Sequence, residues 1–137
     1  MWQSKTLIHL CVVDASQSAS FYEALLGALP AQRDAHSVVF DLDSPPLVLT
    51  VEERPSAKTL PPSEKRFALV VLEPEHVGHA AIRLRRAGVR LRVEDQGIEA
   101  HDPDGNAWRV RLLPFAQRRS VLATRAFREE GGGDEKR

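Results

Sequence analysis

Two pairs of residues in this 137-residue chain have the type and spacing to carry chemistry. His9 and Cys11 lie in the branched run that begins at Leu7, and Arg109 and Arg111 lie in the last such run. Residues two apart in a β-strand point to the same face of a sheet, so each pair is expected to share a face. The imidazole could transfer a proton, and two neighbouring guanidinium groups could hold a carboxylate or phosphate.

The first half of the chain predicts one strand, one helix and then further strands. Residues 7–13 are typical of a strand, and Asp14 and Ser16 follow as residues that favour a helix start. Apolar residues spaced four apart predict a helix over residues 16–26 that ends at Gly27. Further strands are expected at residues 31–33, 37–42 and 47–51.

The same order recurs after a proline-containing connector at residues 54–65. A strand is expected at residues 67–72, and a helix follows that starts at the Glu-Pro-Glu segment and ends at Gly88. The last strands are expected at residues 89–93, 98–101 and 108–113, with HDPDGN as the turn between the final two. The pattern predicts an α+β fold of two βαβββ modules.

Composition narrows the classes of partner. Nineteen basic residues balance nineteen acidic ones, so neither nucleic acid nor an anionic membrane is an expected partner. The single cysteine excludes an internal disulfide and multi-cysteine metal sites. Because no apolar stretch is long enough to span a bilayer, we expect a cytoplasmic location.

Two strings of residues resemble a known superfamily. VVDASQSASFYEALLG is similar to the opening of vicinal-oxygen-chelate proteins, and HDPDGNAWRV resembles the hairpin near the end of their second module. The resemblance implies one domain over residues 1–114, with modules at about residues 5–54 and 66–114. The two modules would form a curled mixed sheet with a central cleft. A second likeness, in SPPLVLTVEERP and VGHAAIRLRRAGV, is to cadmium-induced and carbon–arsenic lyase-like members.

The tail of the chain divides into two parts. Residues 116–128 have helical spacing, whereas the final EEGGGDEKR has nothing to bury. We therefore expect residues 115–137 to form a C-terminal helix followed by a disordered tail.

The resemblance also locates metal-ligand positions. Metalloenzymes of the family take His, Gln or Glu ligands from the first and last strands of their modules, and these positions fall here on Leu7, Phe67 and Arg109. The neighbours of Phe67, Arg66 and Ala68, are not ligands either. The cysteine pair of carbon–arsenic lyases has no counterpart. We therefore predict no metal and no cofactor.

The cleft that the resemblance implies would then have an unusual lining. Trp108 and Val110 are expected to pack on the helix side, which leaves Arg109 facing the cleft, where Glu52, Glu53 or a bound anion should neutralise it. The predicted ligand-binding residues are Leu7, His9, Cys11, Glu52, Phe67, Leu69, Arg109 and Arg111.

These residues predict a metal-free, homodimeric small-molecule-binding protein of the glyoxalase/bleomycin resistance type that sequesters an aromatic or anionic ligand. Family members without metals bind drugs at dimer clefts, so the resemblance implies resistance or metabolite carriage. One alternative is a metal-dependent lyase, isomerase or dioxygenase with shifted ligands, drawn from His9, Glu52 or Glu53, and His101. The other is a metal-free enzyme with His9 as the catalytic acid and base and Arg109 beside an oxyanion.

Overall fold

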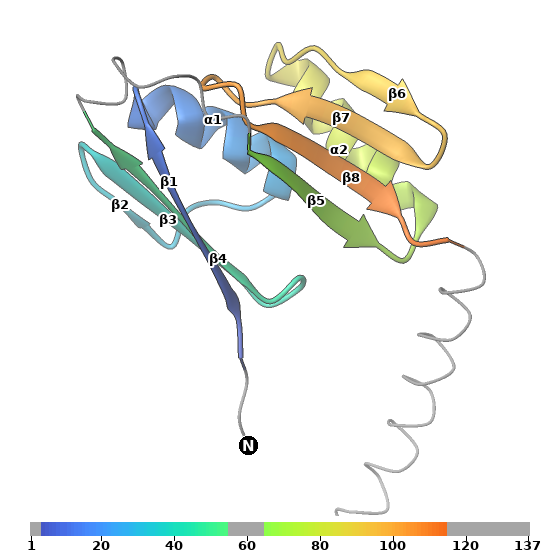
Figure 1. Ribbon diagram of the computed structural model, residues 1–137, viewed down its shortest axis with the longest axis horizontal. Helices are drawn as coiled ribbons and strands as arrows, with labels where there is room; N and C mark the ends of the chain where they lie inside the picture. Colours follow the sequence, from blue (N-terminus) through green and yellow to red (C-terminus); the bar gives the residue numbers. More distant parts are fainter. Residues whose placement is uncertain (1–3, 55–64, 115–137) are drawn as a thin grey trace, which may run out of the picture.

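The first module follows the predicted order of elements (Figure 1). The computed structural model describes residues 4–54 and 65–114, so the tail predicted at residues 115–137 lies outside the described residues. Strand β1 (Thr6–Val12) leads to Asp14, whose carboxylate accepts a hydrogen bond of 3.0 Å from the Gln17 backbone N–H and caps α1 (Ala15–Leu26). Strands β2 (Gln32–Arg33), β3 (Ser37–Leu42) and β4 (Leu47–Glu53) complete the module.

The second module repeats this order. Strand β5 (Arg66–Val71) precedes α2 (Pro74–Arg86), which has Pro74 in its first turn, where the missing N–H does no harm. Strands β6 (Arg92–Glu94), β7 (Gly97–His101) and β8 (Ala107–Leu112) follow. Among the described residues, no helix is long and apolar enough to cross a membrane.

The strands form two separate four-stranded sheets. The first has the order β1-β4-β3-β2 and the second the order β5-β8-β7-β6. Within each sheet the first and last strands of the module pair in parallel, and the other neighbours pair antiparallel. The predicted α+β fold of two βαβββ modules is confirmed. The two sheets are not joined into one: β1 is an edge strand of the first sheet and β5 an edge strand of the second.

Among the described residues, each sheet is covered by a helix on one side only, and both helices lie behind the strands in Figure 1. In β1 the side chains alternate, so Leu10 and Val12 are buried against the core while Leu7, His9 and Cys11 are exposed. We call the uncovered side of each sheet its strand face. The strand faces are where side chains remain accessible to a ligand or partner.

A buried polar cluster joins the two modules on the helix side. The Tyr22 hydroxyl of α1 donates a hydrogen bond to the Asp102 carboxylate, and the Trp108 indole N–H donates to the Tyr22 oxygen over 3.0 Å. Asp102 also accepts from the backbone N–H and side-chain amide of Asn106, both at 2.8 Å. Burial raises the pKa of Tyr22 well above its ordinary value, so the hydroxyl remains a donor at neutral pH.

Two further contacts fix the junction. Asp104, in the same turn as Asp102, accepts a hydrogen bond of 3.0 Å from the Val13 backbone N–H, just before α1 begins. At the other end of α1, the Arg83 guanidinium of α2 donates to the carbonyl oxygens of Ala24 (2.8 Å) and Leu25 (3.2 Å). The two sequence strings that carry the family resemblance therefore contact each other directly.

Candidate functional site

The strand face of the first sheet carries three of the predicted residues together with a glutamate. Leu7, His9 and Cys11 lie on this face, as predicted. The parallel register of β1 and β4 places Cys11 opposite Glu52 and His9 opposite Thr50. Since directly paired residues in a sheet point to the same side, Glu52 shares the face with His9 and Cys11.

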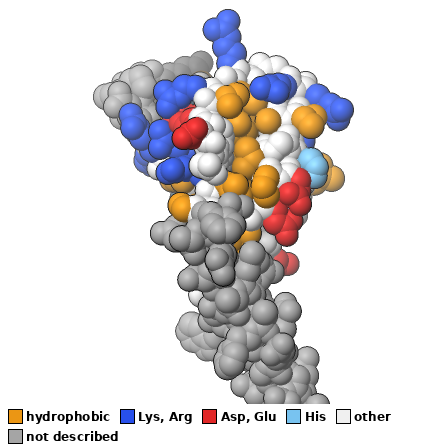
Figure 2. Space-filling model, turned by 90° about the vertical axis from the view of Figure 1, so that its right-hand side faces the viewer, with side chains coloured by type: hydrophobic (Ala, Val, Ile, Leu, Met, Phe, Trp, Pro, Cys, Tyr) orange, Lys and Arg blue, Asp and Glu red, His pale blue; other side chains and the backbone are white. Residues whose placement is uncertain are grey.

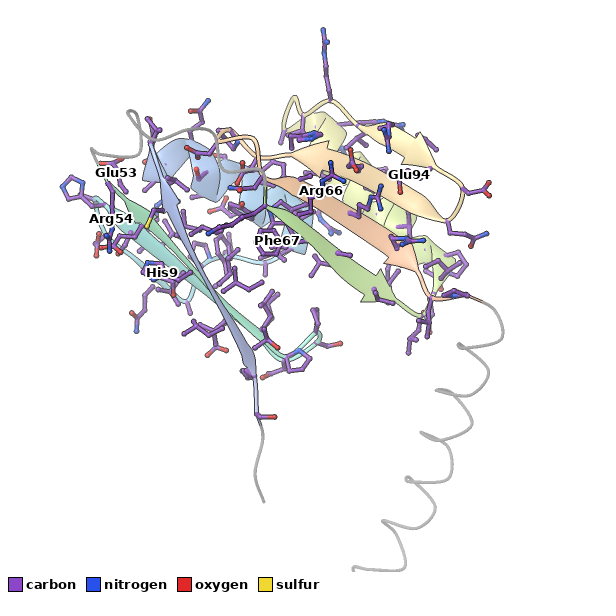
Figure 3. All side chains as sticks on the ribbon, in the orientation of Figure 1. His9, Glu53, Arg54, Arg66, Phe67 and Glu94 are labelled. Atoms are coloured by element: carbon purple, nitrogen blue, oxygen red, sulfur yellow. The ribbon has the colours of Figure 1, made fainter. Side chains whose placement is uncertain are left out.

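Glu52 accepts two contacts on this face. Its Oε2 lies 2.9 Å from His9 Nε2 and 3.3 Å from Arg54 Nη2, and the labelled side chains of His9 and Arg54 lie over the first sheet in Figure 3. The hydrogen bond with His9, followed by that with Arg54, lowers the pKa of Glu52, so the carboxylate is ionised at neutral pH. The ligand atoms of His9, Cys11 and Glu52 all lie within 4.8 Å of one another.

Glu53 and His101 are not part of this group. Glu53 lies 2.9 Å from His36 Nδ1 and accepts a hydrogen bond of 3.1 Å from the Ala15 backbone N–H at the start of α1. His101 lines a groove between α1 and the turn after α2. The combination of His9 with His101, proposed for a shifted metal site, is therefore wrong, and Cys11 takes the third place instead.

The predicted orientation of Phe67 and Leu69 is also wrong. In the parallel register of β5 and β8, Phe67 pairs with Trp108 and Leu69 with Val110, and both partners are buried on the helix side. The Phe67 ring stacks on the Trp108 ring with centroids 4.4 Å apart. Successive residues of a strand point to opposite faces, so an error of one residue in register exchanges the two faces.

The strand face of β5 is formed instead by its alternate residues, Arg66, Ala68 and Val70. Ala68 pairs with Arg109 and Val70 with Arg111, so both arginines of β8 lie on the strand face, as predicted.

Arg109 has acidic partners, although not the predicted ones. Its Nε lies 3.1 Å from Glu99 Oε2 and 3.2 Å from Glu94 Oε1, whereas Glu52 and Glu53 belong to the other sheet. Antiparallel pairing of β7 with β8 places Glu99 directly opposite Arg109, and Arg92 adds a contact of 3.0 Å to Glu94. The sequence does contain a signal for this cluster: the hairpin over residues 97–109 brings Glu99 opposite Arg109. The predicted partners of Arg109 were chosen without using this hairpin.

We expect Arg109→Ala to lower the free energy of unfolding by about 1–2 kcal/mol, because Glu94 and Glu99 are only 18% and 13% exposed and would lose a charged donor. Thermal and urea unfolding measure this loss. Arg85→Ala is the matched control. Arg85 lies in α2 and makes no ion pair inside residues 4–54 and 65–114. An unchanged melting temperature in Arg109→Ala would show that the cluster contributes nothing to stability.

The strand face of the second sheet remains rich in positive charge. It carries four arginines, Arg66, Arg92, Arg109 and Arg111, against the two glutamates Glu94 and Glu99. Figure 2 shows Lys and Arg side chains gathered around acidic ones on one side of the molecule, beside a band of hydrophobic side chains. For Arg111, the described part of the chain offers no carboxylate within 4.0 Å. This face is therefore suited to an anion.

The two grooves described in the molecule lie at the junction of the modules, and Val70 of the strand face lines one of them. One, of about 410 Å³, runs between α1 and the turn after α2, and the other, of about 490 Å³, lies between the C-terminal end of α1, β5 and α2. Neither is lined by His9, Cys11, Glu52, Arg109 or Arg111. These five residues thus lie on open strand faces, which need a covering partner to become a cleft.

The family's metal does not fit at its usual positions in this chain. Leu7 and Arg109 occupy two of these positions on the strand faces, and Arg109 is engaged with two carboxylates. At the third, Phe67 faces the helix side, and its neighbours Arg66 and Ala68 are not ligands. An apolar side chain, a methyl group and guanidinium groups do not coordinate a cation.

Two βαβββ modules with their strand faces uncovered define the class of the fold. The family model of the Glyoxalase/Bleomycin resistance protein/Dioxygenase superfamily matches residues 6–110, and the chain belongs to this superfamily. No curated protein matches at a significant level.

Solved structures agree with this fold. A glyoxalase-related enzyme from Fulvimarina pelagi is 22% identical, with 82% of this chain and 90% of that chain covered and a TM-score of 0.60. The fosfomycin resistance protein FosX from Listeria monocytogenes is 18% identical, with coverage of 86% and 99% and a TM-score of 0.62. The oxidase ChaP-H2 is 14% identical, with coverage of 84% and 97% and a TM-score of 0.63. At these identities the likeness establishes the fold.

Proposed function

We propose that this chain is a small-molecule-binding protein of the glyoxalase/bleomycin resistance type that sequesters an aromatic anion. The observation that carries the proposal is the excess of arginine on the strand face of the second sheet. Arg109 is bound to Glu94 and Glu99, so its role is to stabilise this face of the sheet. Arg111 remains available to contact a ligand. A planar guanidinium presents paired donors that match a carboxylate or phosphate.

The apolar part of the ligand has a surface beside Arg111. Val70 is paired with Arg111 and is 53% exposed, and Ala68 lies two residues away on the same face. An aromatic ring placed on these side chains would remove apolar area from water while its acidic group reaches the guanidinium. This combination favours an aromatic acid over a purely inorganic anion.

A second copy of the chain completes the site in this proposal. The two central edge strands, β1 and β5, expose Leu7 (67%) and Val70 on the uncovered faces. In a homodimer, the strand faces of two copies would pack against each other. This packing would cover the apolar side chains and enclose the ligand between the copies. Sequestration of a drug or metabolite in the cytoplasm, as in a resistance protein, is the role we propose for such a cleft.

Calorimetric titration with a panel of aromatic carboxylates and phosphates tests the proposal. We expect at least one member of the panel to bind, with an affinity that falls as salt is added. In Arg111→Ala the affinity should fall about tenfold or more, which corresponds to about 1.4 kcal/mol of binding free energy. Arg85→Ala, which removes an arginine of α2 distant from the strand face, should bind like the unaltered chain. The proposal fails if no member binds, or if Arg111→Ala binds as tightly as Arg85→Ala.

One contact favours a second function, acid–base catalysis. Glu52 lies 2.9 Å from His9 Nε2, and such a carboxylate fixes the tautomer and the orientation of an imidazole. His9 would then exchange a proton with a substrate through Nδ1. Chemical conversion of a bound ligand that is lost in His9→Gln would favour this function over sequestration.

A further inference from the structure

We propose that His9, Cys11 and Glu52 form a binding site for a thiophilic divalent cation, of the zinc and cadmium type, on the strand face of the first sheet. This departs from the sequence-based prediction that the chain holds no metal. It is also independent of the anion site proposed on the second sheet, because no residue is shared between them.

The three side chains are brought together by the register of two strands. His9 and Cys11 are two residues apart on β1, and Glu52 is directly opposite Cys11 on β4. Their ligand atoms lie within 4.8 Å of one another, and His9 Nε2 is 2.9 Å from Glu52 Oε2. A tetrahedral cation with bonds of about 2.0–2.3 Å holds its ligand atoms about 3.3–3.8 Å apart, so the His9–Glu52 contact would lengthen while any wider separation within the group shortens. His9 and Cys11 are exposed and Glu52 is partly exposed, so small rotamer changes can adjust these distances.

The donor set selects the class of cation. A thiolate and an imidazole are preferred by zinc and by softer ions, whereas calcium and magnesium require oxygen ligands throughout. Three protein ligands leave a fourth tetrahedral position open to water or to a ligand atom. With three protein ligands, the cluster resembles a zinc site that is open to a further ligand. A closed structural zinc site has four protein ligands.

This site is distinct from the ligand positions of the family's metalloenzymes. Leu7 occupies the usual position on β1, whereas His9 and Cys11 are two and four residues further along. All three proposed ligands belong to the first module, so the second module is not needed. Arg54, whose Nη2 lies 3.3 Å from Glu52 Oε2, is the one neighbouring cation described, and it should weaken binding.

The test is a titration of the full, reduced chain with cadmium chloride in chelator-free buffer, followed by ultraviolet absorption of the thiolate-to-metal charge-transfer band. Because the chain has a single cysteine, the band reports on Cys11 alone. We expect one equivalent of cadmium per chain and a band that decreases when zinc competes for the site. Arg54→Ala should tighten binding.

Variants separate this site from binding elsewhere. Cys11→Ser should abolish the band, and His9→Gln and Glu52→Gln should each weaken affinity by at least about tenfold. His36→Gln is the matched control, because His36 Nδ1 makes the same 2.9 Å contact with a glutamate, Glu53, without a thiol in the group. All four side chains are at least partly exposed, and thermal unfolding checks that each variant folds.

Three results would overturn the proposal. The first is the lack of a charge-transfer band at any cadmium concentration. The second is equal loss of affinity in His36→Gln and His9→Gln, which would mean that any histidine–glutamate pair on the surface holds the cation. The third is saturation at half an equivalent, which would place the cation between the cysteines of two copies instead of among three side chains of one.

Discussion

Asp102→Ala is expected to lower the free energy of unfolding by about 3 kcal/mol or more. Asp102 is buried, and its carboxylate accepts hydrogen bonds from the Tyr22 hydroxyl, the Asp104 backbone N–H at 2.9 Å and two N–H groups of Asn106. Alanine leaves these donors without an acceptor in an interior that water does not reach. The loss also separates α1 from the last hairpin, so the two modules should unfold at a lower urea concentration.

Tyr22→Phe provides a graded comparison. It removes one of the donors to Asp102 and also the acceptor of the Trp108 indole N–H, so a smaller loss of about 1–3 kcal/mol is expected. Asp95→Ala, in the turn between β6 and β7, is the control and should be near neutral. If Asp102→Ala were no more destabilising than Asp95→Ala, the buried cluster would not be what holds the modules together.

Gly97→Ala is expected to destabilise the second sheet by about 1–3 kcal/mol. A Cβ atom built on Gly97 would lie 2.1 Å from the Val110 carbonyl oxygen and 3.0 Å from the Arg111 Cα, both of which belong to the backbone of β8. No side chain can rotate away to relieve this overlap, so β7 must move away from β8. That movement would also displace Arg111, which pairs directly with Gly97.

Gly78→Ala is a matched control for the added methyl group. Gly78 lies within α2, and a Cβ there would meet nothing within 4 Å. Alanine favours the helix over glycine, so the melting temperature should rise slightly. Equal behaviour of the two variants in differential scanning calorimetry would contradict the close approach of β7 and β8.

The fold could be predicted because its signals are local. A capping Asp14, an apolar stripe through Phe21 and Leu25, and a left-handed Gly27 each act within a few residues of the chain. The Asp/Gly turn before β8 is equally local. The order of strand, helix and further strands recurs in both halves of the chain, which is why two βαβββ modules were predicted correctly.

The site was harder to predict because it depends on pairing between strands. The face of Phe67 is decided by its register against Trp108, and an error of one residue placed Phe67 and Leu69 on the wrong side. The partners of Arg109 come from the hairpin beside it, whereas charge balance alone pointed to Glu52 or Glu53. Sequence reasoning placed His9 and Cys11 on one face correctly, because alternation along one strand needs no partner.

The Tyr22–Asp102 link shows the same distinction. Both residues belong to the strings that identify the superfamily, and yet nothing in either string states that the two side chains touch. Their contact follows from the packing of α1 against the second module. Long-range contacts of this kind appear only once the relative position of the modules is known.

Amide chemical shifts in a two-dimensional NMR titration test the central claim, ligand binding on the strand faces, most directly. With an aromatic carboxylate from the panel at saturation, we expect the largest changes along β5 and β8, around Ala68 and Arg111, and a second set along β1. Changes confined to the groove formed by the end of α1, the start of α2 and Pro45 would contradict it, because neither Arg109 nor Arg111 lines that groove.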